Sequence, residues 1–147
     1  MNDSEAIIQE IDALEGKEQE HVAWLMSLLD HTNNLVRFSA IRPLIYRCSA
    51  PGIRERLWRL LESESDEDVL LLVISGLSSY YKGSKDLSVI RRFQSAIERV
   101  GDNSQGMRDT LDDAKLSTML GFDTKQIVKM SATDRQRHIA EIDAKLG

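Results

Sequence analysis

The residues that could bind a metal ion are few and scattered. None of the histidines, His21, His31 and His138, stands at metal-ligand spacing from another. Asp134 and His138 are four residues apart, which on a helix favours an ion pair over a ligand set. The sequence therefore predicts no metal site.

Cys48 is the one cysteine of the chain and follows Arg47 directly. A neighbouring cation lowers a thiol's pKa and makes it a nucleophile, but we expect a small cysteine near the core. A lone cysteine forms no disulfide within the chain, which fits a reducing compartment. The chain also has no glycine-rich phosphate loop and no serine-centred elbow motif. We expect a protein that is not an enzyme and needs no cofactor.

The most unusual polar segment is an acidic turn over residues 62–68, which holds five acidic residues among seven. It lacks the glycine and the alternating ligands of a calcium-binding loop. Asp66 is placed to cap the helix that follows. The turn is either solvated or meets a basic partner, and the candidate contacts are Glu62, Glu64, Asp66, Glu67 and Asp68.

Charge is arranged in blocks along the chain. Residues 1–30 hold eight acids and one base, residues 37–59 hold six arginines and one acid, and residues 60–81 hold five acids and no base. The net charge of −5 excludes a globally basic nucleic-acid binder and suits a basic partner. Either the blocks pair across neighbouring helices, or one of them faces a partner.

Helices must position these residues. The chain has only two prolines, and its aliphatic residues recur at helical spacing between polar or glycine-containing breaks. Ser4 or Asp3 is expected to cap the first helix, and Ser84 or Asp86 a later one. The predicted helices cover about 4–15, 17–30, 35–48, 51–62, 69–81, 87–100 and 107–120, with a short turn after Asp123 and a last helix from Thr133.

Three expectations concern particular segments. Pro43 should kink or split the helix that begins at Leu35, and Pro51 suits the first turn of the next helix. The helix over 69–81 is apolar nearly all round and should be the most buried. The longest apolar run, 69–74, is too short to span a bilayer, and the acidic N-terminus is unlike a signal peptide, so we expect a cytoplasmic protein.

Pairs of helices resemble one another. Leu28-Leu29, a polar turn, Val36-Arg37, Ala40-Ile41 and Leu44 are matched 33 positions later by Val69-Leu70, Val73-Ile74 and Leu77 after Leu60-Leu61. A fainter third copy includes Met107-Arg108, Leu111 and Ala114. Self-similarity at this period is typical of helical solenoids.

These residues resemble the HEAT-repeat superfamily, in particular its small stand-alone bacterial members. Two leucines, a polar turn, Val-Arg, then Ala and Leu form the family's pattern, although His31 and Leu70 replace its usual Asp and Arg. The resemblance covers roughly residues 17–120 and implies a right-handed α-solenoid of about three hairpins. Residues 1–16 and 123–147 would be capping helices of one domain over residues 1–147.

The resemblance also implies that the second helix of each hairpin lines a concave surface. Trp24 and Trp58 are expected to be packing residues, whereas Tyr80 or Tyr81 is a candidate contact. The outward positions would be Arg37, Arg42 and Arg47, then Ser75, Ser79 and Tyr80, then Arg108, Asp112 and Lys115. Of these, Arg37, Arg42, Tyr80 and Asp112 are named as partner-binding candidates.

Several functions stay open. The first is a non-catalytic protein-binding module, for example an immunity- or antitoxin-type inhibitor that blocks a basic toxin. An adaptor or regulatory subunit is a rival of the same class. The second is nucleic-acid binding through an arginine-rich face over residues 37–59, which requires Arg37, Arg42 and Arg47 to form one basic stripe. HEAT-like DNA glycosylases would belong to this second class. The third is an enzyme or enzyme-like lyase subunit, because HEAT-like repeats also occur in chromophore lyases.

Overall fold

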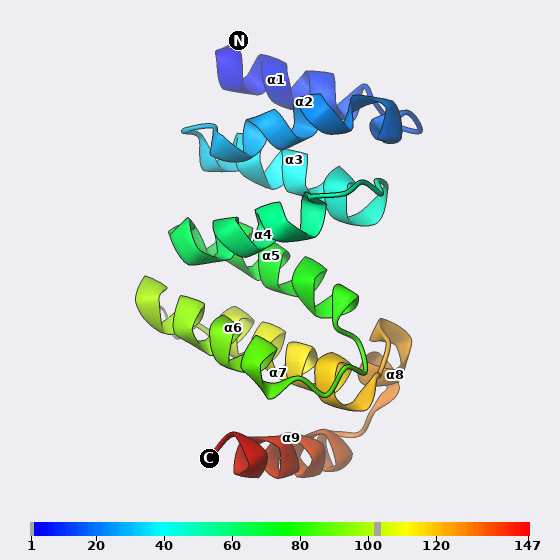
Figure 1. Cartoon of the computed structure of the whole chain (residues 1–147), viewed down its shortest axis with the longest axis vertical. Helices are drawn as coiled ribbons and strands as arrows, with labels where there is room; N and C mark the ends of the chain where they lie inside the picture. Colours follow the sequence, from blue (N-terminus) through cyan, green and yellow to red (C-terminus); the bar gives the residue numbers. More distant parts are fainter. Residues whose placement is uncertain (1, 102–103) are drawn as a thin grey trace. The chain divides into compact units, whose positions relative to one another are not determined.

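The chain is all-α, as the sequence predicts. The computed structural model describes residues 2–101 and 104–147, and within these ranges it is 78% helical and contains no strand. The helices of Figure 1 are α1 (Asp3–Asp12), α2 (Val22–Ser27), α3 (Asn34–Tyr46), α4 (Ile53–Ser63), α5 (Glu67–Tyr80), α6 (Leu87–Val100), α7 (Gln105–Leu120), α8 (Thr124–Lys129) and α9 (Ala132–Leu146).

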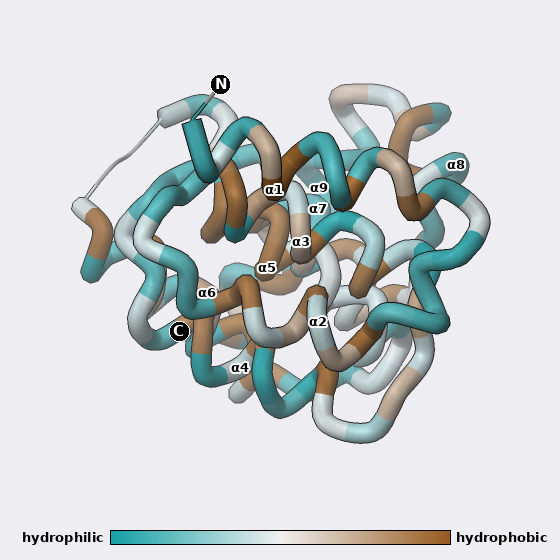
Figure 2. The backbone as a smooth tube through the Cα atoms, turned by 90° about the horizontal axis from the view of Figure 1, so that it is seen from above, coloured by the Kyte–Doolittle hydropathy of each residue, from teal (hydrophilic) through white to brown (hydrophobic). Residues whose placement is uncertain are grey.

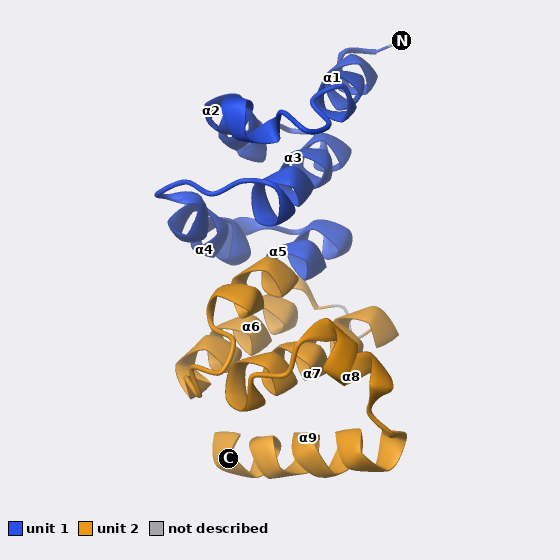
Figure 3. Cartoon of the chain, turned by 90° about the vertical axis from the view of Figure 1, so that its right-hand side faces the viewer, with its two compact units in different colours: residues 1–73 blue, residues 74–147 orange. Residues whose placement is uncertain are grey.

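The chain divides into two compact units, residues 1–73 and residues 74–147 (Figure 3). The division falls within α5. Apolar and polar stretches alternate along the backbone tube (Figure 2), as expected for amphipathic helices that bury one face. Among the described residues, no helix is both long and apolar enough to cross a bilayer.

In the first unit, α1 and α2 both pack against α3. The predicted helix over 17–30 is interrupted, because α2 is flanked by two 3₁₀ turns, Glu18–His21 and Leu28–Asp30. The second turn still buries Leu28 and Leu29. The segment therefore keeps its buried apolar face although part of it has the tighter 3₁₀ geometry. The cap of α1 is Asn2, whose side chain accepts from the Glu5 amide, and not Ser4 or Asp3.

Helix α3 is the central element of the first unit. It runs through Pro43 without splitting and ends three residues later at Tyr46, so of the two predicted effects, a kink or a split, the split is wrong. Proline removes one backbone donor, but the Arg47 amide still bonds to the Pro43 carbonyl at 2.8 Å and completes the last turn. Its inward face, Val36, Ala40, Ile41 and Leu44, is fully buried.

The sequence predicts the start of α5 correctly but not the start of α4. Pro51 lies outside α4, because Gly52 occupies the N-cap with φ +92°, a conformation that favours glycine. The predicted first-turn position of Pro51 is therefore wrong. Asp66 does cap α5, since its Oδ2 accepts from the Val69 amide at 3.0 Å. The expected burial along α5 is also observed, with Val69, Leu70, Val73, Ile74 and Leu77 all at 0% exposure.

In the second unit, α7 packs against α6 and α9. Ile90, Leu116, Met119 and Ile142 form the buried cluster between these helices. Asp86 caps α6, as predicted, and the short helix after Asp123 and the last helix are both present. Of the predicted loop 101–106, residues 102 and 103 lie outside the described residues, and α7 already begins at Gln105.

A close backbone contact joins the α5–α6 loop to the end of α7. The Gly83 and Lys85 amides donate to the carbonyls of Ser117 and Thr118, at 2.9 and 3.0 Å. Gly83 and Gly121 have φ of +72° and +71°, and a Cβ added to Gly83 would lie 3.6 Å from the Gly121 Cα. Glycine at both positions provides the left-handed backbone that this contact uses.

Candidate functional site

The centre of the acidic turn is a buried structural joint. Glu64 is only 3% exposed. Its carboxylate accepts two hydrogen bonds from Arg37, from Nε at 2.9 Å and from Nη2 at 2.7 Å, and others from the Ser65 and Asp66 amides. Arg37 Nη1 also donates to the carbonyls of His31 and Thr32. The hydrogen bonds and the charge of Glu64 raise the pKa of Arg37.

Asp66 strengthens the same joint. Its Oδ1 accepts from Asn34 Nδ2 at 2.8 Å, while its other oxygen caps α5. The first turn of α3 and the turn before α5 are therefore tied by two side-chain contacts. Of the remaining candidates in the acidic turn, Glu62 and Asp68 are exposed and Glu67 is half-buried. Glu64 of the turn binds Arg37 of the same chain, so fewer carboxylates of the turn are available to a partner.

The predicted stripe of Arg37, Arg42 and Arg47 does not exist as one face. Residues five apart on a helix differ by about 140° in direction, so Arg37 points away from Arg42. Another arginine of the block, Arg56, pairs with Asp30. Arg42 and Arg47 are exposed, and within the described part of the chain neither forms an ion pair.

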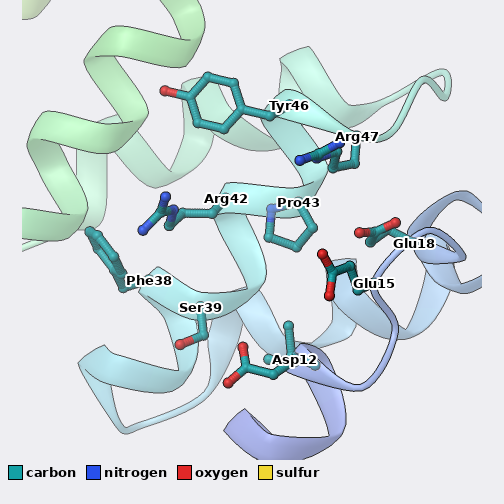
Figure 4. A pocket seen from close by; sticks show the side chains of 10 residues that line it. Asp12, Glu15, Glu18, Phe38, Ser39, Arg42, Pro43, Tyr46 and Arg47 are labelled. Carbon is teal, nitrogen blue, oxygen red and sulfur yellow. The ribbon is translucent and has the colours of Figure 1, made fainter.

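Arg42 and Arg47 line a groove of about 700 Å³ on the first unit (Figure 4). One side comes from α3 and the other from the end of α1 and the residues that follow it. The α3 side is formed by Phe38, Ser39, Arg42, Pro43, Tyr46 and Arg47, and the other side by Ile11, Asp12, Glu15 and Glu18.

The α3 wall is built from residues at helical spacing. Phe38, Arg42 and Tyr46 are four residues apart, which places them in one row along the helix. The Arg42 guanidinium carbon lies 5.9 Å from the centre of the Phe38 ring, a cation–π distance that orients the charge. Tyr46 is 62% exposed. The row therefore presents an aromatic surface around a cation that no carboxylate of the described residues neutralises.

Carboxylates form the opposite wall. Asp12 and Glu15 are exposed and, among the described residues, make no ion pair. Glu18 accepts from the Gly16 amide at 3.1 Å. Backbone hydrogen bonds at Glu18 and Gly16, together with the charge of Arg47, lower the pKa of Glu18. The groove thus has an acidic wall and a cationic, aromatic wall.

A reciprocal contact fixes one end of the groove. Gln19 Nε2 donates to the Ser49 carbonyl at 2.9 Å, and the Ser49 amide donates to Gln19 Oε1 at 2.6 Å. This pair ties the segment after α3 to the segment after α1, the two sides that carry Arg47 and Glu18. Nearby Cys48 is half-buried, and burial and the charge of Glu18 raise the pKa of its thiol, where the sequence suggested that Arg47 would lower it.

The second unit places two predicted surface residues differently from expectation. Lys115 is 6% exposed instead of outward-facing, because its Nζ bonds to Asp143 at 2.7 Å and lies 3.6 Å from Asp112. Asp112 is half-buried at the edge of a hollow of about 330 Å³ that Arg135 and Ile139 also line. Burial raises the pKa of Asp112, and the charges of Lys115 and Arg135 act in the opposite direction.

The remaining candidates do not line the groove. Tyr80 is 38% exposed at the end of α5. Trp24 and Trp58 are half-buried, in keeping with packing roles. His138 packs edge-on against Phe122, and its Nδ1 is buried without a hydrogen-bond partner. The described residues contain no group of three or more His, Cys, Asp or Glu side chains that could hold a metal ion.

Sequence reasoning missed the groove. It named Arg42 but passed over Tyr46, Phe38 and the carboxylates Asp12 and Glu15. A signal was present for α3, because residues 38, 42 and 46 are spaced four apart. No comparable signal links α1 to α3, since only folding brings these segments together.

Comparison of the chain with known protein families, with characterised proteins and with solved structures finds no match. The resemblance to HEAT repeats therefore stays a prediction, and the function must be argued from the groove itself.

Proposed function

We propose that this chain is a non-catalytic protein-binding module and that the groove between α1 and α3 is its docking site. The observation that supports the proposal most directly is the row of half-buried Phe38 and exposed Arg42 and Tyr46. Tyrosine and arginine are the residue types that dominate binding hot spots, because they combine apolar area with directed polar groups. An exposed cation beside an aromatic ring gains from a partner that supplies the missing counter-charge.

The finer architecture belongs to the same proposal. A HEAT-like solenoid is supported by the 33-residue offset of the repeats and by the joint that ties turn 31–34 to turn 63–66. In such a protein, hairpins stack to bury faces that one hairpin cannot bury alone. The narrower function, an immunity- or antitoxin-type inhibitor of a basic toxin, is supported by the net charge of −5 and by three carboxylates in the groove.

Nucleic-acid binding is the weaker alternative. Arg37 and Arg56 neutralise Glu64 and Asp30, which leaves the arginine block with less free charge than the sequence suggested. A phosphate backbone in the groove would also pass Asp12, Glu15 and Glu18, and like charges at close range oppose binding. Tyr46 and Arg42 of α3 therefore suit a protein partner better than a nucleic acid.

The proposal can be tested by capture from nuclease-treated native lysate at moderate salt. The wild-type chain is compared with the double variant Arg42→Glu/Tyr46→Ala, and Arg91→Glu on the exposed face of α6 is the matched charge control. Thermal melts establish that all three chains fold. We expect a stoichiometric protein partner with the wild type and with Arg91→Glu, and at least tenfold less of it with the double variant, a loss of about 1.4 kcal/mol or more. Equal capture by all three chains would show that the groove is not the docking site.

A further inference from the structure

The two walls of the groove differ in charge, and this difference restricts what can occupy it. We infer that the occupant is a peptide segment of a partner protein that carries one carboxylate and at least one lysine or arginine, with an apolar residue between them. This inference rests on the proposed function and adds the chemistry and the orientation of the segment. The carboxylate would meet Arg42, and the basic side chain would meet Asp12 and Glu15.

The charges of the groove residues support a mixed segment. Backbone hydrogen bonds and, to a smaller extent, the charge of Arg47 lower the pKa of Glu18, and Arg47 forms no ion pair with it among the described residues. Asp12 and Glu15 on one wall and Arg42 on the other are left without ion pairs among the described residues. With Glu18 and Arg47 included, the groove holds three carboxylates and two guanidiniums, so an occupant with a slight excess of positive charge would balance it.

The arrangement of the side chains supports an apolar spacer. In the view of Figure 4, Pro43 lies between Arg42 and Glu15, and Tyr46 also lines the groove. Proline has no side-chain hydrogen-bonding group, so the middle of the groove offers van der Waals contact instead of polar partners. Exposed aromatic and proline surface is best covered by an aliphatic or proline side chain.

Other occupants fit less well. A uniformly acidic chain, including a nucleic acid, would place charge beside three carboxylates, and a uniformly basic segment would place charge beside Arg42. In each case one wall would be opposed by a like charge, which costs affinity and excludes the wrong partner. Only a segment that carries both signs in the right order satisfies both walls.

The probe is a displayed library of random twelve-residue peptides, selected on the immobilised full-length chain. Enriched peptides are synthesised, and their affinities are measured by fluorescence anisotropy against the wild type, Arg42→Glu, Asp12→Lys/Glu15→Lys, Tyr46→Ala and the control Arg91→Glu. We expect one acidic and one or more basic residues at a preferred spacing around an apolar residue. Each groove variant should lower the affinity for these peptides about tenfold or more, which is the scale of a hot-spot loss. Arg91→Glu should leave their affinity unchanged.

Charge reversal within the peptide provides the decisive comparison. Replacing the acidic peptide residue by lysine should weaken binding to the wild type and restore binding to Arg42→Glu. Another result is that the peptides bind more weakly to Tyr46→Ala but with unchanged affinity to both charge variants. That result would overturn the inference and leave the groove as a docking site. Peptides whose affinity is also unchanged with Tyr46→Ala would overturn the proposed function itself. Enrichment of purely basic or purely acidic peptides, or of none, would also contradict the inferred occupant.

Discussion

Arg37 and Glu64 form a bidentate ion pair 27 residues apart in sequence, at the joint between the first turn of α3 and the turn before α5. Glu64 is almost fully buried, whereas it was expected to face a partner. Two further amides and two further carbonyls complete the network, so nearly every polar atom of the pair is used. The charge that dominates this stretch of sequence therefore stabilises the first unit.

This pair predicts a large stability loss. Glu64→Gln removes the counter-charge of Arg37, which keeps only neutral carbonyl partners, and removal of one partner of a buried ion pair destabilises a protein by about 3–5 kcal/mol. Because the Arg37 side chain keeps some contact with solvent, we expect the lower end, about 3 kcal/mol, in urea unfolding. Asp68→Asn, in the same turn but exposed, is the control and should change stability by less than about 0.5 kcal/mol. Similar losses in both variants would mean that the turn needs its net charge and not this pair.

Asp112 predicts a pH dependence. Its pKa is raised by burial, so the folded chain holds this proton more tightly than the unfolded chain does. The resulting stabilisation is fully present below the unfolded value, about 3.9, and is lost as pH rises through the higher folded value. Asp112→Asn stays neutral throughout, so its stability relative to the wild type should rise with pH across this window. Urea unfolding at a series of pH values from 3 to 7 measures it.

The matched control is Glu141→Gln, which changes an exposed carboxyl of α9 in the same unit. Its stability difference from the wild type should stay flat over the same pH series. If Asp112→Asn is equally flat, burial of Asp112 does not shift its titration.

The contact between Gly83 and Gly121 predicts a conformational cost. Both residues have positive φ, and alanine in this conformation costs about 1–2 kcal/mol. The added Cβ meets only ordinary van der Waals distances, so strain in the backbone and not a clash should dominate. Thermal unfolding of Gly83→Ala and Gly121→Ala should show this loss. Gly106→Ala, in the first turn of α7, should instead stabilise by about 0.5–1 kcal/mol, and the idea fails if all three variants behave alike.

Cys48 should be a slow nucleophile. Burial and the neighbouring charge of Glu18 raise the pKa of its thiol, which lowers the thiolate fraction at pH 8. Alkylation by iodoacetamide, followed by mass spectrometry, should be slower in the folded chain than in the urea-unfolded chain. Glu18→Gln should speed the reaction of the folded chain, whereas Glu20→Gln should leave it unchanged. A folded thiol that reacts as fast as the unfolded one would contradict this.

Local chemistry explains what the sequence predicted well. Caps such as Asp66 and Asp86 act on amides two or three residues away, so neighbouring residues suffice to identify them. The buried faces of α3 and α5 follow from apolar residues at helical spacing, and Leu44 and Leu77 are fully buried as that spacing requires. The same reasoning failed at Pro51, because Gly52 with its positive φ is the N-cap and α4 starts two residues later, at Ile53.

The sequence by itself determined the all-α class, most of the helix positions and the residues that face the core, because each depends on spacing within a few turns. Only the tertiary structure decided which charges are neutralised in ion pairs within the chain. Arg37 is neutralised by Glu64 and Lys115 by Asp143, whereas Arg42 is left unpaired opposite Asp12 and Glu15. These partners lie 27 to 30 residues away in the chain, so their distances depend on how helices pack and not on local propensity.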